Sequence, residues 1–192
     1  KLVDAVTAVN ENVVVALSGG SAIEMPWADK VKGILNCVLG GEASGSAAAD
    51  ILFGDVNPSG KLAETYPLSL SDNPSYNYYP GYTASVEYKE SVFVGYRYYD
   101  TAEKNVLFPF GYGLSYTNFE YSDIKLSADS IKDTDKVTVS FKIKNTGSVD
   151  GAEVAQIYVT DNESTIFRPK QELKGFKKVF LKKGEKQNEN IV

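Results

Sequence analysis

Hydrophobic positions in the first third of the chain alternate between helical spacing and short unbroken runs. Helical spacing predicts a helix over residues 1–10, and unbroken apolar runs predict strands buried on both faces at residues 12–17 and 33–39. A short helix is predicted after Pro26 and an alanine-rich helix over residues 43–53. This alternation indicates an α/β layered unit with a mostly parallel sheet. Two or three strands are too few for a complete domain, so we expect part of a three-layer α/β sandwich.

The middle of the chain carries a weaker pattern. Four prolines in residues 55–82 predict loops. Residues 86–99 have the β-branched and aromatic composition of a strand, and glycines punctuate residues 109–116. We therefore expect one extended segment between two irregular connections.

The last part of the chain shows the alternation of a sheet. Apolar and polar residues alternate over residues 137–143, which is typical of a strand with one face in water. About five such strands are predicted, whereas an all-β immunoglobulin or fibronectin type III sandwich has seven in roughly 100 residues, so one or two strands are expected to be missing. The predicted domains are residues 1–116, which include a Tyr-rich loop at 72–99, and residues 117–192.

Composition narrows the function classes. The chain has 192 residues, and 43% of them are apolar, which is typical of a globular protein. A net charge of -5 and the lack of a long basic run argue against nucleic acid as a partner. No stretch is long and apolar enough to span a membrane. The single cysteine, Cys37, excludes an internal disulfide and leaves the compartment open, cytoplasmic or secreted.

Histidine is absent, which excludes a Ser-His-Asp triad, a Cys-His pair and any His-ligated metal site. No phosphate-binding glycine motif and no EF-hand loop occur, so we predict no metal and no cofactor. Carboxylates remain, and glycoside hydrolysis needs two of them facing each other. The sequence alone does not pair the available ones, which are Glu24, Glu42, Asp50, Asp55, Glu87 and Glu90.

Tyrosines crowd the proline-rich loop. They are Tyr76, Tyr78, Tyr79 and Tyr82. A tyrosine ring suits contact with sugars and proteins, because its faces are apolar and its hydroxyl can form hydrogen bonds. This cluster is the best candidate for contact with a substrate or a neighbouring domain. Plain packing within the loop is the alternative.

Several blocks of sequence form an ordered set. The most specific are ADILFGDVNPSGKL at residues 49–62, FVGYRYYD at 93–100, LFPFGYGLSY at 107–116 and RPKQELKGF at 168–176. In order and spacing they resemble glycoside hydrolase family 3, the family of many β-glucosidases and β-xylosidases. The resemblance extends from residue 12 to about residue 180.

The resemblance implies a place within a larger enzyme. Family members typically carry a nucleophilic Asp on a barrel domain, and in many the second, α/β sandwich domain carries the acid/base Glu. A fibronectin type III-like domain follows. This chain is similar to the end of the second domain and most of the third, so we assign no catalytic residue to it. One departure is Ser91, where the family often has glycine.

The implied reaction is retaining hydrolysis of terminal, non-reducing β-D-glucosyl residues, with xylose and N-acetylglucosamine left open as the sugar. The implied partners are a β-linked oligosaccharide or aryl glucoside and the catalytic barrel domain of the same enzyme. This chain would supply pocket wall and support, and alone it is expected to be inactive and weakly stable. The alternative is a stand-alone carbohydrate-binding or adhesion module without catalysis.

Overall fold

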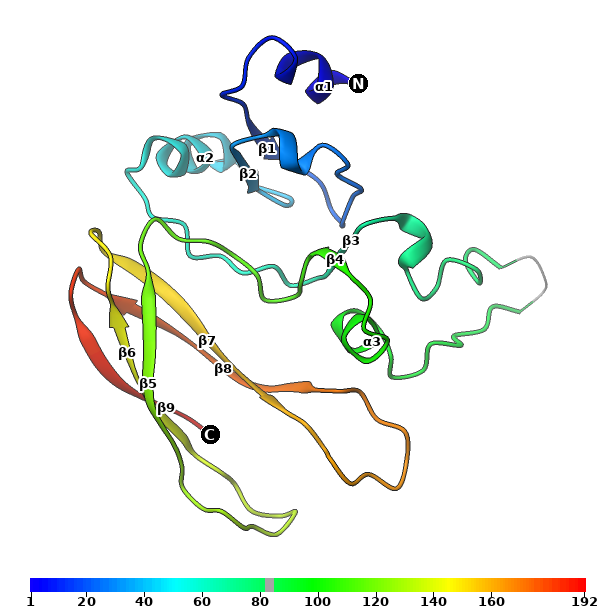
Figure 1. The fold of residues 1–192 in the computed structure, drawn as a ribbon, viewed down its shortest axis with the longest axis vertical. Helices are drawn as coiled ribbons and strands as arrows, with labels where there is room; N and C mark the ends of the chain where they lie inside the picture. Colours follow the sequence, from blue (N-terminus) through cyan, green and yellow to red (C-terminus); the bar gives the residue numbers. More distant parts are fainter. Residues whose placement is uncertain (82–84) are drawn as a thin grey trace. The chain divides into compact units, whose positions relative to one another are not determined.

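The computed structural model describes residues 1–81 and 85–192. These residues divide into two compact units, drawn in Figure 1. Unit 1 comprises residues 1–56 and 63–110, and unit 2 comprises residues 57–62 and 111–192. The chain therefore passes between the units three times, each time within or at the end of one of the blocks at 49–62 and 107–116.

Unit 1 carries the predicted α/β alternation. Its elements are α1 (Leu2–Thr7), β1 (Val14–Leu17), η1 (Ala28–Lys30), β2 (Gly33–Asn36), α2 (Ser44–Phe53), β3 (Tyr66–Pro67), η2 (Leu70–Asp72), α3 (Tyr96–Thr101) and β4 (Val106–Phe108). β1 and β2 pair in parallel, with Val15 opposite Ile34, and Figure 1 shows α2 close to this pair. β3 and β4 form a short antiparallel pair. The predicted parallel α/β unit is confirmed.

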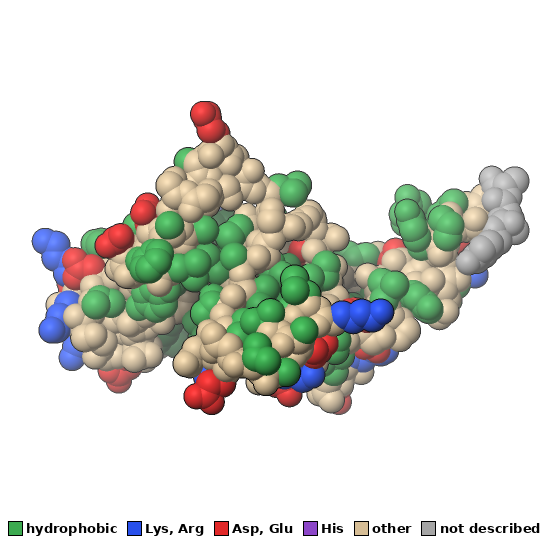
Figure 2. Space-filling model, turned by 90° about the horizontal axis from the view of Figure 1, so that it is seen from above, with side chains coloured by type: hydrophobic (Ala, Val, Ile, Leu, Met, Phe, Trp, Pro, Cys, Tyr) green, Lys and Arg blue, Asp and Glu red, His purple; other side chains and the backbone are tan. Residues whose placement is uncertain are grey.

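Burial in unit 1 is lower than the apolar runs predict. Val14 of β1 is 52% exposed, and Phe53 at the end of α2 is 85% exposed. A two-stranded sheet with few helices cannot cover both of its faces, so the expectation of strands buried on both sides is wrong for the described residues. Figure 2 shows hydrophobic side chains gathered in patches on the face that it displays.

Residues 86–99 do not form the predicted strand. They are irregular up to Gly95, which is the N-cap of α3. Ser91 has a φ of 51° and Gly95 a φ of 56°. An extended strand requires negative φ at every residue, so these two positions end it whatever the composition around them.

Unit 2 is a β-sandwich. Its strands are β5 (Phe119–Leu126), β6 (Val139–Asn145), β7 (Gly151–Val159), β8 (Glu172–Leu181) and β9 (Lys186–Ile191). One sheet has the order β5-β6-β9 and the other pairs β7 with β8, and all of these pairs are antiparallel. The predicted five strands are confirmed.

The core of unit 2 lies between the two sheets. Ile143 and Leu181 are fully buried at its centre. Phe141, Ala155, Val179 and Ile191 complete the cluster. Residues from the same strand are two apart, because alternate side chains of a strand point to the same face.

A buried asparagine, Asn145, joins the end of β6 to three other segments. Its Oδ1 accepts hydrogen bonds from Thr117 Oγ1 at 2.6 Å and Gly147 N at 3.1 Å. Its Nδ2 donates to the carbonyl oxygens of Val149 at 2.8 Å and Leu181 at 3.2 Å. The fully buried amide therefore uses both donors and both acceptor positions, which fixes the connections at this end of the sandwich.

We expect Asn145→Ala to lower the free energy of unfolding by about 2–4 kcal/mol, because it leaves buried polar groups without partners. Chemical denaturation followed by circular dichroism measures this. Asn188→Ala, on the exposed side of β9, is the control and should change stability by less than about 0.5 kcal/mol. Equal effects of the two substitutions would contradict the role given to Asn145.

Candidate functional site

The predicted contact site begins directly after η2 in unit 1. Ser69 N donates to Asp72 Oδ2 at 3.1 Å, and Lys104 Nζ lies 3.3 Å from Asp72 Oδ1. Leu70 N donates to a carboxylate oxygen of Glu24. These contacts fix the position at which the chain enters residues 73–81, which we call the tyrosine segment.

Local hydrogen bonds coil the start of the tyrosine segment. Asn73 Oδ1 accepts from Ser75 N at 3.0 Å and from Ser75 Oγ at 2.8 Å, which is an Asx turn. The carbonyl of Ser75 then accepts from Tyr78 N at 2.9 Å and Tyr79 N at 3.0 Å. The Asn-Pro-Ser sequence thus sets the backbone that carries the tyrosines.

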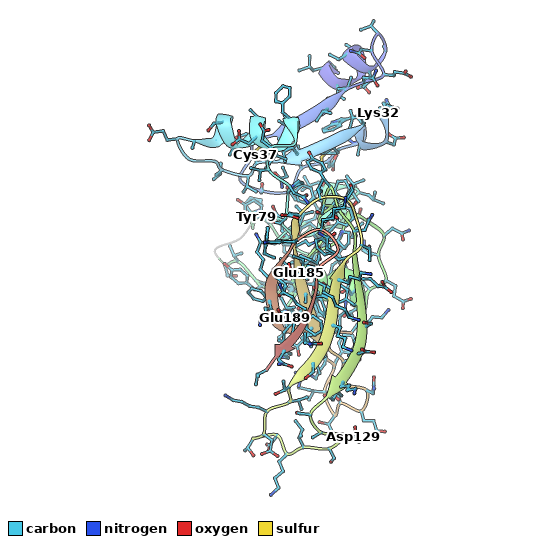
Figure 3. The ribbon with its side chains drawn as sticks, turned by 90° about the vertical axis from the view of Figure 1, so that its left-hand side faces the viewer. Lys32, Cys37, Tyr79, Asp129, Glu185 and Glu189 are labelled. Carbon is cyan, nitrogen blue, oxygen red and sulfur yellow. The ribbon has the colours of Figure 1, made fainter. Side chains whose placement is uncertain are left out.

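The structure places three of the four predicted tyrosines at the surface. Tyr76 is 48% exposed, Tyr78 39% and Tyr79 75%. Figure 3 marks Tyr79. Tyr82 lies outside the described residues. All three described side chains are exposed, and their contact with a substrate or a neighbouring domain stays a prediction.

A cation lies near one of these rings. Lys89 Nζ is 4.8 Å from the ring centroid of Tyr78 and 2.8 Å from Glu87 Oε2. The hydrogen bond from Lys89 lowers the pKa of Glu87 and raises that of Lys89 itself. Both charges are exposed, so the pair adds little stability. The cation lies over one face of the Tyr78 ring. Tyr79, at 75% exposed, is the most exposed of the three tyrosines.

The tyrosines of α3 have a different role. The rings of Tyr96 and Phe110 stack with centroids 4.7 Å apart, and Tyr98 meets Tyr99 edge-on at 5.3 Å. Tyr99 is buried, and this burial, with the nearby charge of Asp72, raises the pKa of its hydroxyl. These are packing residues, whereas the tyrosine segment presents its rings outward.

Of the candidate carboxylates, Glu90 has the most unusual surroundings. Its Oε2 is buried and accepts no hydrogen bond in the part of the chain that the structure describes. Nothing in the structure explains this. Glu24 binds the Leu70 amide, as above. The other four are exposed: Glu42, Asp50, Asp55 and Glu87.

Within residues 1–81 and 85–192, no group of three or more Cys, Asp or Glu side chains is placed to hold a metal ion. The helices in the same ranges are too short or too polar to cross a membrane.

Two of the signature blocks meet in unit 2. We call their meeting parts, residues 57–62 and 111–116, the clasp. Asn57 Oδ1 accepts from Ser115 Oγ at 2.9 Å and from Tyr116 N at 2.8 Å. Asn57 Nδ2 donates to the carbonyl of Asp150 at 2.8 Å. One side chain thus joins both halves of the clasp to the start of β7.

Lys61 makes the second connection of the clasp. Its Nζ donates to the Gly113 carbonyl at 2.7 Å and lies 3.0 Å from the Glu153 carboxylate. The two side chains are only 16% and 15% exposed. A Cβ at Gly113 would overlap the carbonyl oxygen of Gly60, so this close approach requires glycine. The sequence showed these residues as a signature but gave no sign that they bind one another.

The sequence matches two family models. Residues 1–116 match the Glycosyl hydrolase family 3 C-terminal domain, and residues 153–191 match the Fibronectin type III-like domain. The chain belongs to glycosyl hydrolase family 3. The predicted family and fold class are confirmed. Residues 117–152 lie in neither match, so the predicted boundary after residue 116 stays a prediction.

Relatives within family 3 are closely similar over nearly the whole chain. The thermostable beta-glucosidase B of Acetivibrio thermocellus is 57% identical over 96% of this chain and 24% of its own length. The exo-alpha-(1->6)-L-arabinopyranosidase of Bifidobacterium breve is 49% identical over 99% of this chain and 25% of its own length. The chain therefore spans about a quarter of the length of these curated relatives.

Solved family 3 structures agree with this fold. The GH3 beta-glucosidase of Bifidobacterium adolescentis superposes with a TM-score of 0.92 at 47% identity, over 98% of this chain and 28% of that one. The Kluyveromyces marxianus beta-glucosidase in complex with glucose has a TM-score of 0.92 at 43% identity, over 99% of this chain and 23% of that one.

The backbone at Ser91 favours the glycine that the resemblance implies at this position. Its φ of 51° lies in the left-handed region, where a side chain is strained. We expect Ser91→Gly to raise the free energy of unfolding by up to about 1 kcal/mol, because the strain removed exceeds the added chain entropy. Thermal denaturation measures this. Ser21→Gly, at an exposed residue with negative φ, is the control and should give no gain; a loss at Ser91 as large as at Ser21 would contradict the explanation.

Proposed function

We propose that this chain is part of a retaining β-glucosidase that hydrolyses terminal, non-reducing β-D-glucosyl residues. The observation that carries the proposal is 57% identity to a β-glucosidase over 96% of the chain. In this proposal the substrate is a β-linked oligosaccharide or an aryl glucoside. The nucleophile and the acid/base, carboxylates about 5–5.5 Å apart in retaining enzymes, both lie outside these 192 residues.

The chain would then have two tasks. Unit 2, closed by the clasp, provides a rigid support. Its apolar core is packed between the two sheets, and the polar groups of Lys61 and Asn145 have hydrogen-bond partners. The exposed rings of the tyrosine segment in unit 1 contact the leaving group of the substrate. A relative at 49% identity is named for an arabinopyranoside, so the choice of sugar would rest on residues outside this chain.

Tyr79 is the residue we assign to substrate contact, with Tyr76 and Tyr78 beside it. It has the most exposed ring of the three, and an aromatic face stacks on the apolar face of a pyranose or on an aryl leaving group. The proposal for these side chains rests on their exposure and on the hydrogen bonds that fix their backbone.

In the longest natural polypeptide that contains this chain, we expect Tyr79→Ala to lower kcat/KM for an aryl β-glucoside about 2- to 12-fold, because ring contacts contribute about 0.5–1.5 kcal/mol. Most of the change should appear in KM. Steady-state kinetics measure it, and Tyr79→Phe, which keeps the ring, should restore the activity.

The 192-residue chain assayed alongside should show no turnover. Turnover by that chain, free of any second polypeptide, would contradict the assignment of both carboxylates to other parts of the enzyme. Unchanged kinetics for Tyr79→Ala would contradict the assignment of Tyr79 to substrate contact. That result would not contradict the proposed reaction.

A further inference from the structure

The topology of unit 1 brings two charged residues together at the entrance of the tyrosine segment. β3 and β4 pair in an antiparallel manner, with Pro67 opposite Val106. In such a pair, the chain leaves one strand beside the point at which it enters the other. η2 follows β3, and Asp72 is its last residue, whereas Lys104 lies two residues before β4. The strand pairing therefore places these two residues side by side, although they are far apart in the sequence.

Asp72 and Lys104 form an ion pair. Lys104 Nζ lies 3.3 Å from Asp72 Oδ1, and the side chains of the two residues are 37% and 28% exposed, respectively. The other carboxylate oxygen, Asp72 Oδ2, accepts a hydrogen bond from Ser69 N at 3.1 Å. One carboxylate thus joins the start of η2 to the connection between α3 and β4.

The position of Lys104 is itself set by α3. The chain turns at Glu103, which has a φ of 50°, and Lys104 N then donates to the Tyr99 carbonyl at 3.0 Å. Tyr99 is a buried residue of α3, only 4% exposed. Lys104 Nζ also lies 5.9 Å from the ring centroid of Tyr98, near the outer limit of a cation–π contact. The ammonium group therefore extends towards η2 from a packed helix.

The tyrosine segment depends on this entrance for its direction. The hydrogen bonds that residues 74–81 make with other described residues all lie within residues 73–81, so they coil the backbone without joining it to the rest of unit 1. The link to η2 is Asn73 N, which donates to the Leu70 carbonyl at 3.1 Å. Lys89 meets the Tyr78 ring further along, through an exposed cation. Whatever orients η2 therefore orients the rings that follow it.

We propose that Lys104 is a positioning residue for the substrate contact of Tyr79, and that it acts through Asp72 and η2. This rests on the proposed function. An ion pair with this much access to water contributes little to the stability of the fold, so loss of Lys104 leaves unit 1 folded and changes the direction of the tyrosine segment. A ring that stacks on a substrate is sensitive to such a change, because a displacement of about 1 Å weakens a positioned contact.

A double-mutant cycle tests the proposal in the longest natural polypeptide that contains this chain. Lys104→Met should raise KM for an aryl β-glucoside about 2- to 5-fold with kcat nearly unchanged, and Lys104→Arg, which keeps the charge, should restore KM. In a Tyr79→Ala background, Lys104→Met should have no further effect, because the contact through which it acts is already lost. Lys30→Met removes an exposed ion pair with Asp4 and is the control, which should leave KM unchanged. An unchanged KM for Lys104→Met, or an equal rise in both backgrounds, would overturn the proposal.

Hydrogen exchange measures the positioning without relying on activity. The amide hydrogens of Asp72 and Asn73 are bonded to carbonyls at the start of η2, and we expect them to exchange several-fold faster in Lys104→Met than in the unchanged protein or in Lys30→Met. Unchanged exchange would overturn the positioning role, whatever the kinetics show. Faster exchange combined with unchanged kinetics for Tyr79→Ala would instead refute the substrate contact, and with it the role of Lys104 in binding. Turnover of the aryl glucoside by the unchanged polypeptide tests the proposed reaction separately.

Discussion

The mostly buried contact of Lys61 with Glu153 and with the Gly113 carbonyl is the constraint on which the structure of unit 2 depends. The chain leaves and enters unit 2 at residues 56–57, 62–63 and 110–111, and the clasp holds the unit 2 side of all three crossings. Taking one partner away would leave the other charge with reduced access to water and no counterion, which is costly. Asn57 adds hydrogen bonds to the same two segments, so loss of either residue would loosen both.

These contacts give the family 3 signature a structural role. The residues Asn57, Gly60, Lys61 and Gly113 bind one another and the sandwich, and their spacing is set by that packing. A signature of this kind indicates which segments of the chain pack against one another. In the proposed enzyme, the clasp and the buried amide of Asn145 would make unit 2 rigid, and the exposed rings of the tyrosine segment would meet the substrate.

Much of the fold could be predicted from the sequence, because it follows from alternation. The five sandwich strands and the parallel pair β1–β2 could be predicted because the apolar pattern of each strand lies within its own residues. The segment 86–99 was predicted wrongly because two left-handed residues, Ser91 and Gly95, decide its path, and neither leaves a signal in apolar spacing. The site was predictable only in part: the tyrosines could be named, but their exposure depends on turns around Asn73 and Ser75. The contacts of Lys61 and Asn145 join residues far apart in the sequence, so no local pattern reveals them.

Covalent trapping of the reaction intermediate would identify the nucleophilic carboxylate directly. A retaining glycosidase forms a glycosyl-enzyme bond to its nucleophilic carboxylate, and a fluorinated glucoside with a good leaving group makes that bond long-lived. We would treat the longest natural polypeptide that contains this chain with such a compound and map the labelled peptide by mass spectrometry. A label on an aspartate outside residues 1–192 is the expected result. A label on Glu90, Asp50 or any other carboxylate within the chain would contradict the view that it supports catalysis without performing it.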